Sequence, residues 1–174
     1  MLVTSIQTSK ISFLVSPALP LFLSVVLCAA AGNAQTPPPP AQKIYAQKLV
    51  DETLAAHPEL MGFELAATPP GKTQCVTIAS NETKGIGEKC DKDEFTAMKT
   101  NKPFVEKEKE NGKEVYDVTI PIHDASGKII ATAGIDFKPE PNQTDAQVIE
   151  RSQQIAKELE SKVKSKEKLF EPVG

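Results

Sequence analysis

The sequence predicts an α+β domain in which a five-stranded antiparallel sheet is flanked by a long N-terminal helix and a C-terminal helix. Residues 114–123 and 129–138 alternate apolar and polar side chains, as strands with one packed face do. Apolar residues recur at helical spacing before and after the strand-rich region. Asn-Gly and Pro-Gly pairs lie between the strand segments and indicate tight turns.

Residues 42–57 form the first predicted helix, because their apolar side chains share one side and the charged ones lie elsewhere. Residues 62–68 and 73–80 are rich in β-favouring types and predict a hairpin around the Pro-Pro-Gly-Lys turn between them. A short helix follows and runs to about Lys99. An aspartate at its start, Asp91 or Asp93, can cap it.

Three further strands, 103–109, 114–123 and 129–138, complete the expected sheet. An Asn-Gly pair connects the first two, and a short glycine-containing turn connects the last two. The final helix should begin after Thr144, which forms a capping-box pattern with the glutamine three residues later. Its apolar stripe continues to about residue 164.

The first 34 residues have the layout of a secretory signal peptide. They contain no acidic residue and one base, Lys10, which precedes an apolar run over 11–31. The tripeptide Gly-Asn-Ala ends at Ala34 and marks a cleavage site there. We therefore expect a periplasmic or secreted protein. The alternatives are an uncleaved membrane anchor, because about 20 apolar residues can span a bilayer, and a lipid anchor on Cys28.

The remaining chain predicts a mildly acidic domain without a membrane anchor of its own. The whole chain of 174 residues has a formal net charge of −3, and signal cleavage removes one base. No basic cluster indicates a nucleic-acid partner. No segment after the signal is long and apolar enough to span a membrane. Residues 35–41 are proline-rich and predict an extended tether to the domain.

Cys75 and Cys90 are the two cysteines that remain after signal cleavage. Export places them in an oxidising compartment, where disulfides persist. A bridge between them would close a loop of about 15 residues and stabilise the fold by roughly 3 kcal/mol. Two buried free thiols are the alternative, whereas the spacing differs from that of a redox-active Cys-x-x-Cys pair.

No pattern in the sequence predicts catalysis, a metal site or a bound cofactor. His57 and His123 are the two histidines, and neither has further ligands at metal-site spacing. A haem-attachment motif and a Gly-x-Ser-x-Gly nucleophile motif are both absent. We therefore expect a protein that is not an enzyme and that holds no cofactor.

The second half of the chain carries a recognisable order of motifs. A strand begins at Lys102-Pro103, and a hairpin turn follows at Asn111-Gly112. The next strand contains Ile-Pro-Ile at 120–122 and ends in His-Asp at 123–124. Ser-Gly-Lys at 126–128 then leads into the small-residue segment 130–136. This order resembles the closing hairpin of extracytoplasmic Cache domains, which are PAS-like sensor modules. The preceding long helix and the helix near Asp93 are also similar to those of a single Cache domain.

The resemblance covers residues 42–139 and implies a stand-alone exported form of this PAS/Cache-like fold, followed by a C-terminal helix and tail at 140–174. Two features differ from Cache receptors. This chain has no transmembrane helix or cytoplasmic signalling domain after the signal, and its single arginine, Arg151, lies beyond the sheet. The resemblance therefore predicts the fold more strongly than the ligand.

The resemblance also implies a ligand pocket between the sheet and the segment 81–102. The residues expected near it are Val76, Ile78, Phe95, Tyr116, Val118 and Ile120. Tyr116 could orient a ligand, and Lys84 could contact a carboxylate ligand. The alternative is that the apolar members simply fill the core.

We thus expect a non-catalytic small-molecule-binding or sensory accessory domain. One alternative is an envelope protein-interaction module that docks on a receptor or other protein partner without a ligand. A lesser alternative is an envelope hydrolase, although no catalytic triad, metal set or nucleotide loop supports it.

Overall fold

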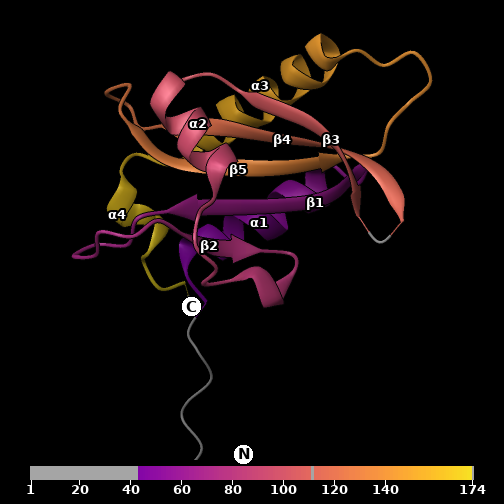
Figure 1. Cartoon of the computed structure of the whole chain (residues 1–174). Coiled ribbons are helices and arrows are strands. Elements are labelled where there is room, and N and C mark those ends of the chain that lie inside the picture. Colours follow the sequence, from indigo (N-terminus) through magenta and orange to yellow (C-terminus); the bar gives the residue numbers. More distant parts are fainter. Residues whose placement is uncertain (1–42, 111, 174) are drawn as a thin grey trace, which may run out of the picture. The chain divides into compact units, whose positions relative to one another are not determined.

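The computed structural model describes residues 43–110 and 112–173, so the predicted signal peptide and tether lie outside the described residues. The elements are α1 (Tyr45–Ala56), β1 (Leu60–Ala67), β2 (Val76–Ser80), the 3₁₀ turn η1 (Thr83–Gly85), α2 (Lys92–Thr100), β3 (Phe104–Glu110), β4 (Lys113–His123), β5 (Ile129–Phe137), α3 (Asp145–Lys162) and α4 (Lys166–Leu169) (Figure 1).

The five strands form one antiparallel sheet in the order β2-β1-β5-β4-β3. The hairpins β1–β2, β3–β4 and β4–β5 join neighbours in sequence, whereas β1 and β5 meet at the centre of the sheet. The predicted α+β class with a five-stranded antiparallel sheet and flanking helices is confirmed, and the fold is PAS-like.

The main hydrophobic core lies between one face of the sheet and the helices α1, α3 and α4. Figure 1 shows α1 and α3 behind the sheet and α2 in front of it. On β4 and β5 the core side chains alternate, as predicted: Ile120 is 3% exposed and Ile135 is 0% exposed. The alternate residues of these strands face α2, because successive side chains on a strand point to opposite faces.

The C-terminal segment belongs to the same core. Leu169 in α4 is 1% exposed. The chain after it pairs with the residues before α1: Tyr45 N donates to Glu171 O at 2.8 Å, and Val173 N donates to Lys43 O at 2.8 Å. The tail therefore closes the described domain beside its first helix instead of extending away from it.

Both predicted helix caps are present. The side chain of Asp91 accepts from Asp93 N, and Glu94 reaches back to the Asp91 N–H, which begins α2 with a capping box. Thr144 and Gln147 form the same reciprocal pair at the start of α3. In the described part of the chain, no helix has the length and apolar character needed to cross a membrane.

Candidate functional site

A pocket of about 230 Å³ lies on the face of the sheet that α2 partly covers. Its floor comes from β1, β5 and β4, and its wall comes from the segment between β2 and α2. Eight of its lining residues are acidic, and none is basic. These acidic residues are Glu64, Glu82, Glu88, Asp91, Asp93, Glu94, Asp117 and Asp136.

The strand register places three of these acids on neighbouring strands of the floor. Asp117 on β4 lies opposite Asp136 on β5, and Glu64 on β1 lies opposite Gly134. Like charges directly opposite each other in an antiparallel pair are destabilising. The pair of Asp117 and Asp136 therefore lowers the stability of the sheet, and sheet stability alone does not explain these acids.

Two glycines make room for the acidic side chains. A Cβ atom at Gly62 would lie 2.0 Å from Asp136 Oδ2, and one at Gly134 would lie 2.9 Å from Glu64 Cγ. The two acidic side chains thus lie across backbone that carries no side chain. Because larger residues would displace them, the two glycines allow the carboxyl side chains of Asp136 and Glu64 to lie on the floor of the pocket.

The wall of the pocket is attached to the edge strand. Thr77 N donates to Glu88 O at 2.9 Å, and Gly87 N donates to Thr77 O at 2.8 Å. The predicted disulfide between Cys75 and Cys90 is confirmed, and it joins the start of β2 to the residue before the cap of α2. The bridge and the backbone hydrogen bonds together hold the wall against the sheet.

The floor acids have strongly raised pKa values. Burial, followed by the neighbouring charges of Glu94 and Asp136, raises the pKa of Glu64 to about 7. Burial, followed by the charges of Asp136 and Glu108, raises the pKa of Asp117 to about 8. No basic side chain among the described residues forms an ion pair with either carboxyl group. Both carboxyls therefore hold a proton for part of the time near neutral pH.

The acids of the wall differ from those of the floor. Asp91 and Glu94 accept backbone hydrogen bonds in the capping box, although burial still raises the pKa of Glu94. These two carboxyls already have a structural role. Glu64 and Asp117 have no such hydrogen bonds from described residues, so they are available to a ligand.

A threonine hydroxyl also lines the floor. Thr119 on β4 is 3% exposed and lines the pocket beside Asp117. No described residue forms a hydrogen bond with its hydroxyl group. Among the described residues, Thr132 Oγ1 is the buried side-chain atom without a partner. The Thr119 hydroxyl is instead open to the pocket, where water or a ligand can satisfy it.

The structure places the sequence-predicted ligand residues elsewhere. The five that lie on strands pack in or against the main core, on the sheet face opposite the pocket: Val76, Ile78, Tyr116, Val118 and Ile120. Phe95 is 54% exposed on α2, and Lys84 is exposed in η1. None of the seven lines the acidic pocket. For the strand residues, the alternative that they fill the core agrees with the structure.

The expected position of the pocket, between the sheet and the segment 81–102, does agree with the structure. The predicted strand residues do not line the pocket, because their apolar side chains face the larger core on the other side of the sheet. The sequence signal for this site was an acid among the apolar residues of each of three strands: Glu64, Asp117 and Asp136. The alternation of the strands puts the last two on the face opposite the apolar set.

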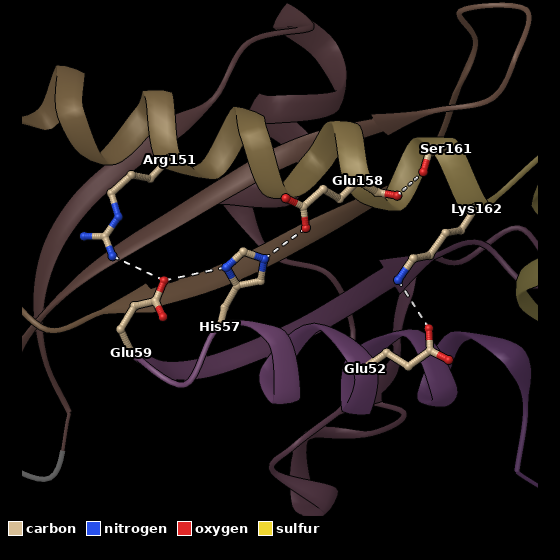
Figure 2. Close-up of polar contacts among 7 residues, drawn as sticks. All are labelled: Glu52, His57, Glu59, Arg151, Glu158, Ser161 and Lys162. Carbon is tan, nitrogen blue, oxygen red and sulfur yellow. Dashed lines mark hydrogen bonds and ion pairs between the residues drawn. The ribbon is translucent and has the colours of Figure 1, made fainter.

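Both histidines have structural contacts. His57 ends α1, and its ring nitrogens face Glu158 at 3.0 Å and Glu59 at 3.6 Å (Figure 2). Arg151 extends from α3 to the same Glu59, at 3.4 Å. These contacts connect α1 and α3 on the outside of the core. Among the described residues, no group of three or more His, Cys, Asp or Glu side chains could hold a metal ion.

No protein-family model and no curated protein matches the chain. Among solved structures, the chain is similar to a double mutant of the inducer-binding domain of the PobR transcription factor from Acinetobacter, in complex with 3-hydroxybenzoic acid. The two are 14% identical with a TM-score of 0.41, and the match covers 68% of this chain and 97% of that chain.

Proposed function

We propose that this protein is an exported, non-catalytic domain that binds a small molecule in the acidic pocket and serves as a sensory or binding accessory. The observation that carries the proposal is the pocket itself. It combines ionisable groups of raised pKa, a threonine hydroxyl that faces the pocket and two glycines that make room for the floor carboxyls. Convergent polar groups with perturbed pKa values in a well-formed hollow are typical of a binding site.

Binding is favoured over catalysis because the pocket offers only carboxyl groups and one unpartnered hydroxyl, with no histidine among its lining residues. Its one unpartnered hydroxyl, that of Thr119, has no base other than carboxyl groups around it. Nucleophilic catalysis by a hydroxyl requires a base that takes its proton, and that base is usually oriented by a third group. The resemblance to stand-alone Cache domains also supports a binding role.

The proposal is tested by mass spectrometry of small molecules released when the purified protein is denatured. A Gly85→Trp change places a large side chain at the pocket lining, where a Cβ atom meets no other atom within 4 Å. We expect this variant to retain the fold and to lose the released molecule. Thr83→Trp, at an exposed position of the same 3₁₀ turn outside the pocket lining, is the matched control and should retain it.

Export is a separate part of the proposal. It is supported by the N-terminal sequence pattern, and the disulfide is compatible with an oxidising compartment. N-terminal sequencing of protein from the periplasmic or secreted fraction should begin at Gln35. Recovery of the intact chain from the cytosol or the inner membrane would contradict export.

A protein-interaction role is the second candidate, and one surface feature favours it. Phe95 is 54% exposed and lies over a shallow hollow of about 630 Å³ that also includes Met98 and the disulfide. Exposed aromatic groups beside apolar surface are typical of interfaces. If this role is correct, Phe95→Ser should abolish capture of a partner from an envelope extract, whereas Gly85→Trp should not.

A further inference from the structure

We propose that the ligand of this pocket is a small aliphatic amine, held as an ammonium ion by Glu64 and Asp117, with diamines preferred over monoamines. This inference rests on the proposed function and adds the chemical class of the ligand. Its first support is the charge of the pocket. Eight acidic groups and no basic group line it, although the whole chain carries a net charge of only −3. A cation is the ligand that such a lining favours.

The second support is the Thr119 hydroxyl. This side chain is 3% exposed, lines the pocket and has no hydrogen-bond partner among the described residues. An ammonium group carries three N–H donors, and a hydroxyl oxygen can accept one of them while carboxyl oxygens accept the others. An amine thus satisfies this hydroxyl and the acids at the same time.

The size of the pocket favours an organic cation over a bare metal ion. Its volume of about 230 Å³ corresponds to roughly seven or eight water molecules. Drug-sized ligands occupy pockets of about 300–1,000 Å³, so the ligand should be smaller than these. The described residues also provide no group of three or more metal-ligating side chains.

The arrangement of the floor favours two positive charges over one. Glu64 rises from β1 and Asp117 from β4, with β5 between them. Their backbones are therefore two strand spacings apart, about 10 Å, and the Glu64 side chain extends over Gly134 of β5 into the space between them. Two ammonium groups joined by a short methylene chain can each contact a different carboxyl group. A single ammonium group compensates only one of the two carboxylate charges.

The protons that Glu64 and Asp117 hold near neutral pH provide a second way to detect this ligand, because its binding should release them. Groups that face Glu64 are Asp136 on β5, Glu94 on α2, and Asp91 and Glu88 in the wall, and all of them are acidic. Asp117 faces Asp136, Glu64, Asp93 on α2 and Glu108 on β3. A bound cation would lower the pKa values of both carboxyls, because it favours their charged forms. Amine binding should therefore release protons and tighten between pH 6 and pH 8.5.

The test is calorimetric titration of the purified protein with four four-carbon molecules that differ in charge: 1,4-diaminobutane, butylamine, 1,4-butanediol and succinate. We expect the diamine to bind, butylamine to bind more weakly, and the diol and succinate not to bind. Asp117→Asn and Glu64→Gln should each weaken diamine binding about tenfold or more, the effect of losing one hydrogen bond to a charged group. Glu150→Gln removes one exposed charge outside the pocket and should leave binding unchanged.

Loss of folding is not expected in the two pocket variants, because each replaces a carboxyl whose charged form is disfavoured in the fold. Circular dichroism will verify this. Titration in two buffers with different ionisation enthalpies measures the released protons directly. A diamine that binds without proton release, or with equal affinity in both variants, overturns the proposal.

The outcomes separate this inference from the proposed function. Binding of the diol or of succinate that depends on Asp117 would overturn the amine but retain the pocket as a binding site. Binding of calcium in place of the diamine would do the same. If none of these molecules binds and the denatured protein releases no small molecule, the proposed function fails as well.

Discussion

The floor carboxyls show how the environment of a single residue changes its chemistry. Asp117 would have an ordinary pKa of 3.8 in an exposed setting, whereas in the fold it is raised to about 8. Between about pH 4 and pH 8, the folded protein therefore retains a proton on Asp117 that the unfolded chain has already released. Stability from this group is fully present below pH 4 and is lost as the pH rises through 8.

We predict that Asp117→Asn will reduce the pH dependence of stability. The thermal midpoint of the wild type should fall between pH 5 and pH 9 by more than that of the variant, because the amide stays neutral throughout. Thermal melts at several pH values in the absence of ligand will measure this. Parallel curves for the two proteins would contradict the raised pKa. Glu150→Gln, an exposed position, is the control.

The residues at the end of β4 give a second prediction at this scale. Ile120→Ala should cost about 2–5 kcal/mol, because Ile120 is buried in the main core. His123 is more exposed, at 25% of its side chain. However, its ring contacts Glu160 Oε1 and Asn101 Oδ1, both at 2.7 Å. The loss of about 0.5 kcal/mol that is typical of surface sites is therefore too small for this histidine.

For His123→Ala we expect a loss of about 1–2 kcal/mol, since each lost hydrogen bond is worth roughly 0.5–1.5 kcal/mol. Urea denaturation of both variants will compare the two losses. A larger loss for His123→Ala than for Ile120→Ala would mean that the register of β4 is wrong.

At the scale of elements, the disulfide is the strongest local constraint on the pocket wall. Cys75 and Cys90 are separated by 15 residues and enclose β2, η1 and the turn beyond it. The loop includes Glu82 and Glu88, which line the pocket. Reducing the bridge should therefore affect both stability and ligand binding.

We predict that replacing both cysteines with serine will lower stability by about 3 kcal/mol, the loop-closure value for a loop of this length. Binding of 1,4-diaminobutane should weaken in the same variant, because the wall loses its attachment to the sheet. Chemical denaturation and calorimetry measure the two effects. Unchanged stability would indicate that the backbone hydrogen bonds from Thr77 to the wall are sufficient by themselves.

At the scale of the whole molecule, the last residues complete the core that the sheet and α1 begin. Leu169 is 1% exposed, and Pro172 forms an isolated bridge with Ile44 next to α1. The C-terminal stretch thus joins the two ends of the described domain. The sequence indicated a tail after the final helix, and it did not indicate this contact.

We predict that Leu169→Ala will destabilise the protein by about 2–5 kcal/mol, as expected for a buried leucine. Lys164→Ala, at an exposed position just before α4, should change stability by less than about 0.5 kcal/mol. Thermal or urea melts will compare the two. Equal effects would show that the tail is not part of the cooperative unit.

Much of the fold could be predicted from local signals. The alternation on β4 and β5 identified which side chains are buried together, because a strand places every second residue on the same face. Thr144 and the acids before α2 marked helix starts, because a side-chain oxygen there satisfies backbone N–H groups. The disulfide followed from the two remaining cysteines and the oxidising compartment that the export pattern predicts.

Only the tertiary structure decided which face of the sheet holds the pocket. Apolar strand residues such as Val118 were equally compatible with a ligand cavity or a core, and the placement of α1 and α3 on their face made it the core. The acidic site depends on the pairing of β1 with β5, which brings Glu64 beside Gly134 across a long separation in sequence. Sequence patterns report the faces of each strand, but long-range strand pairing determines which residues of different strands meet.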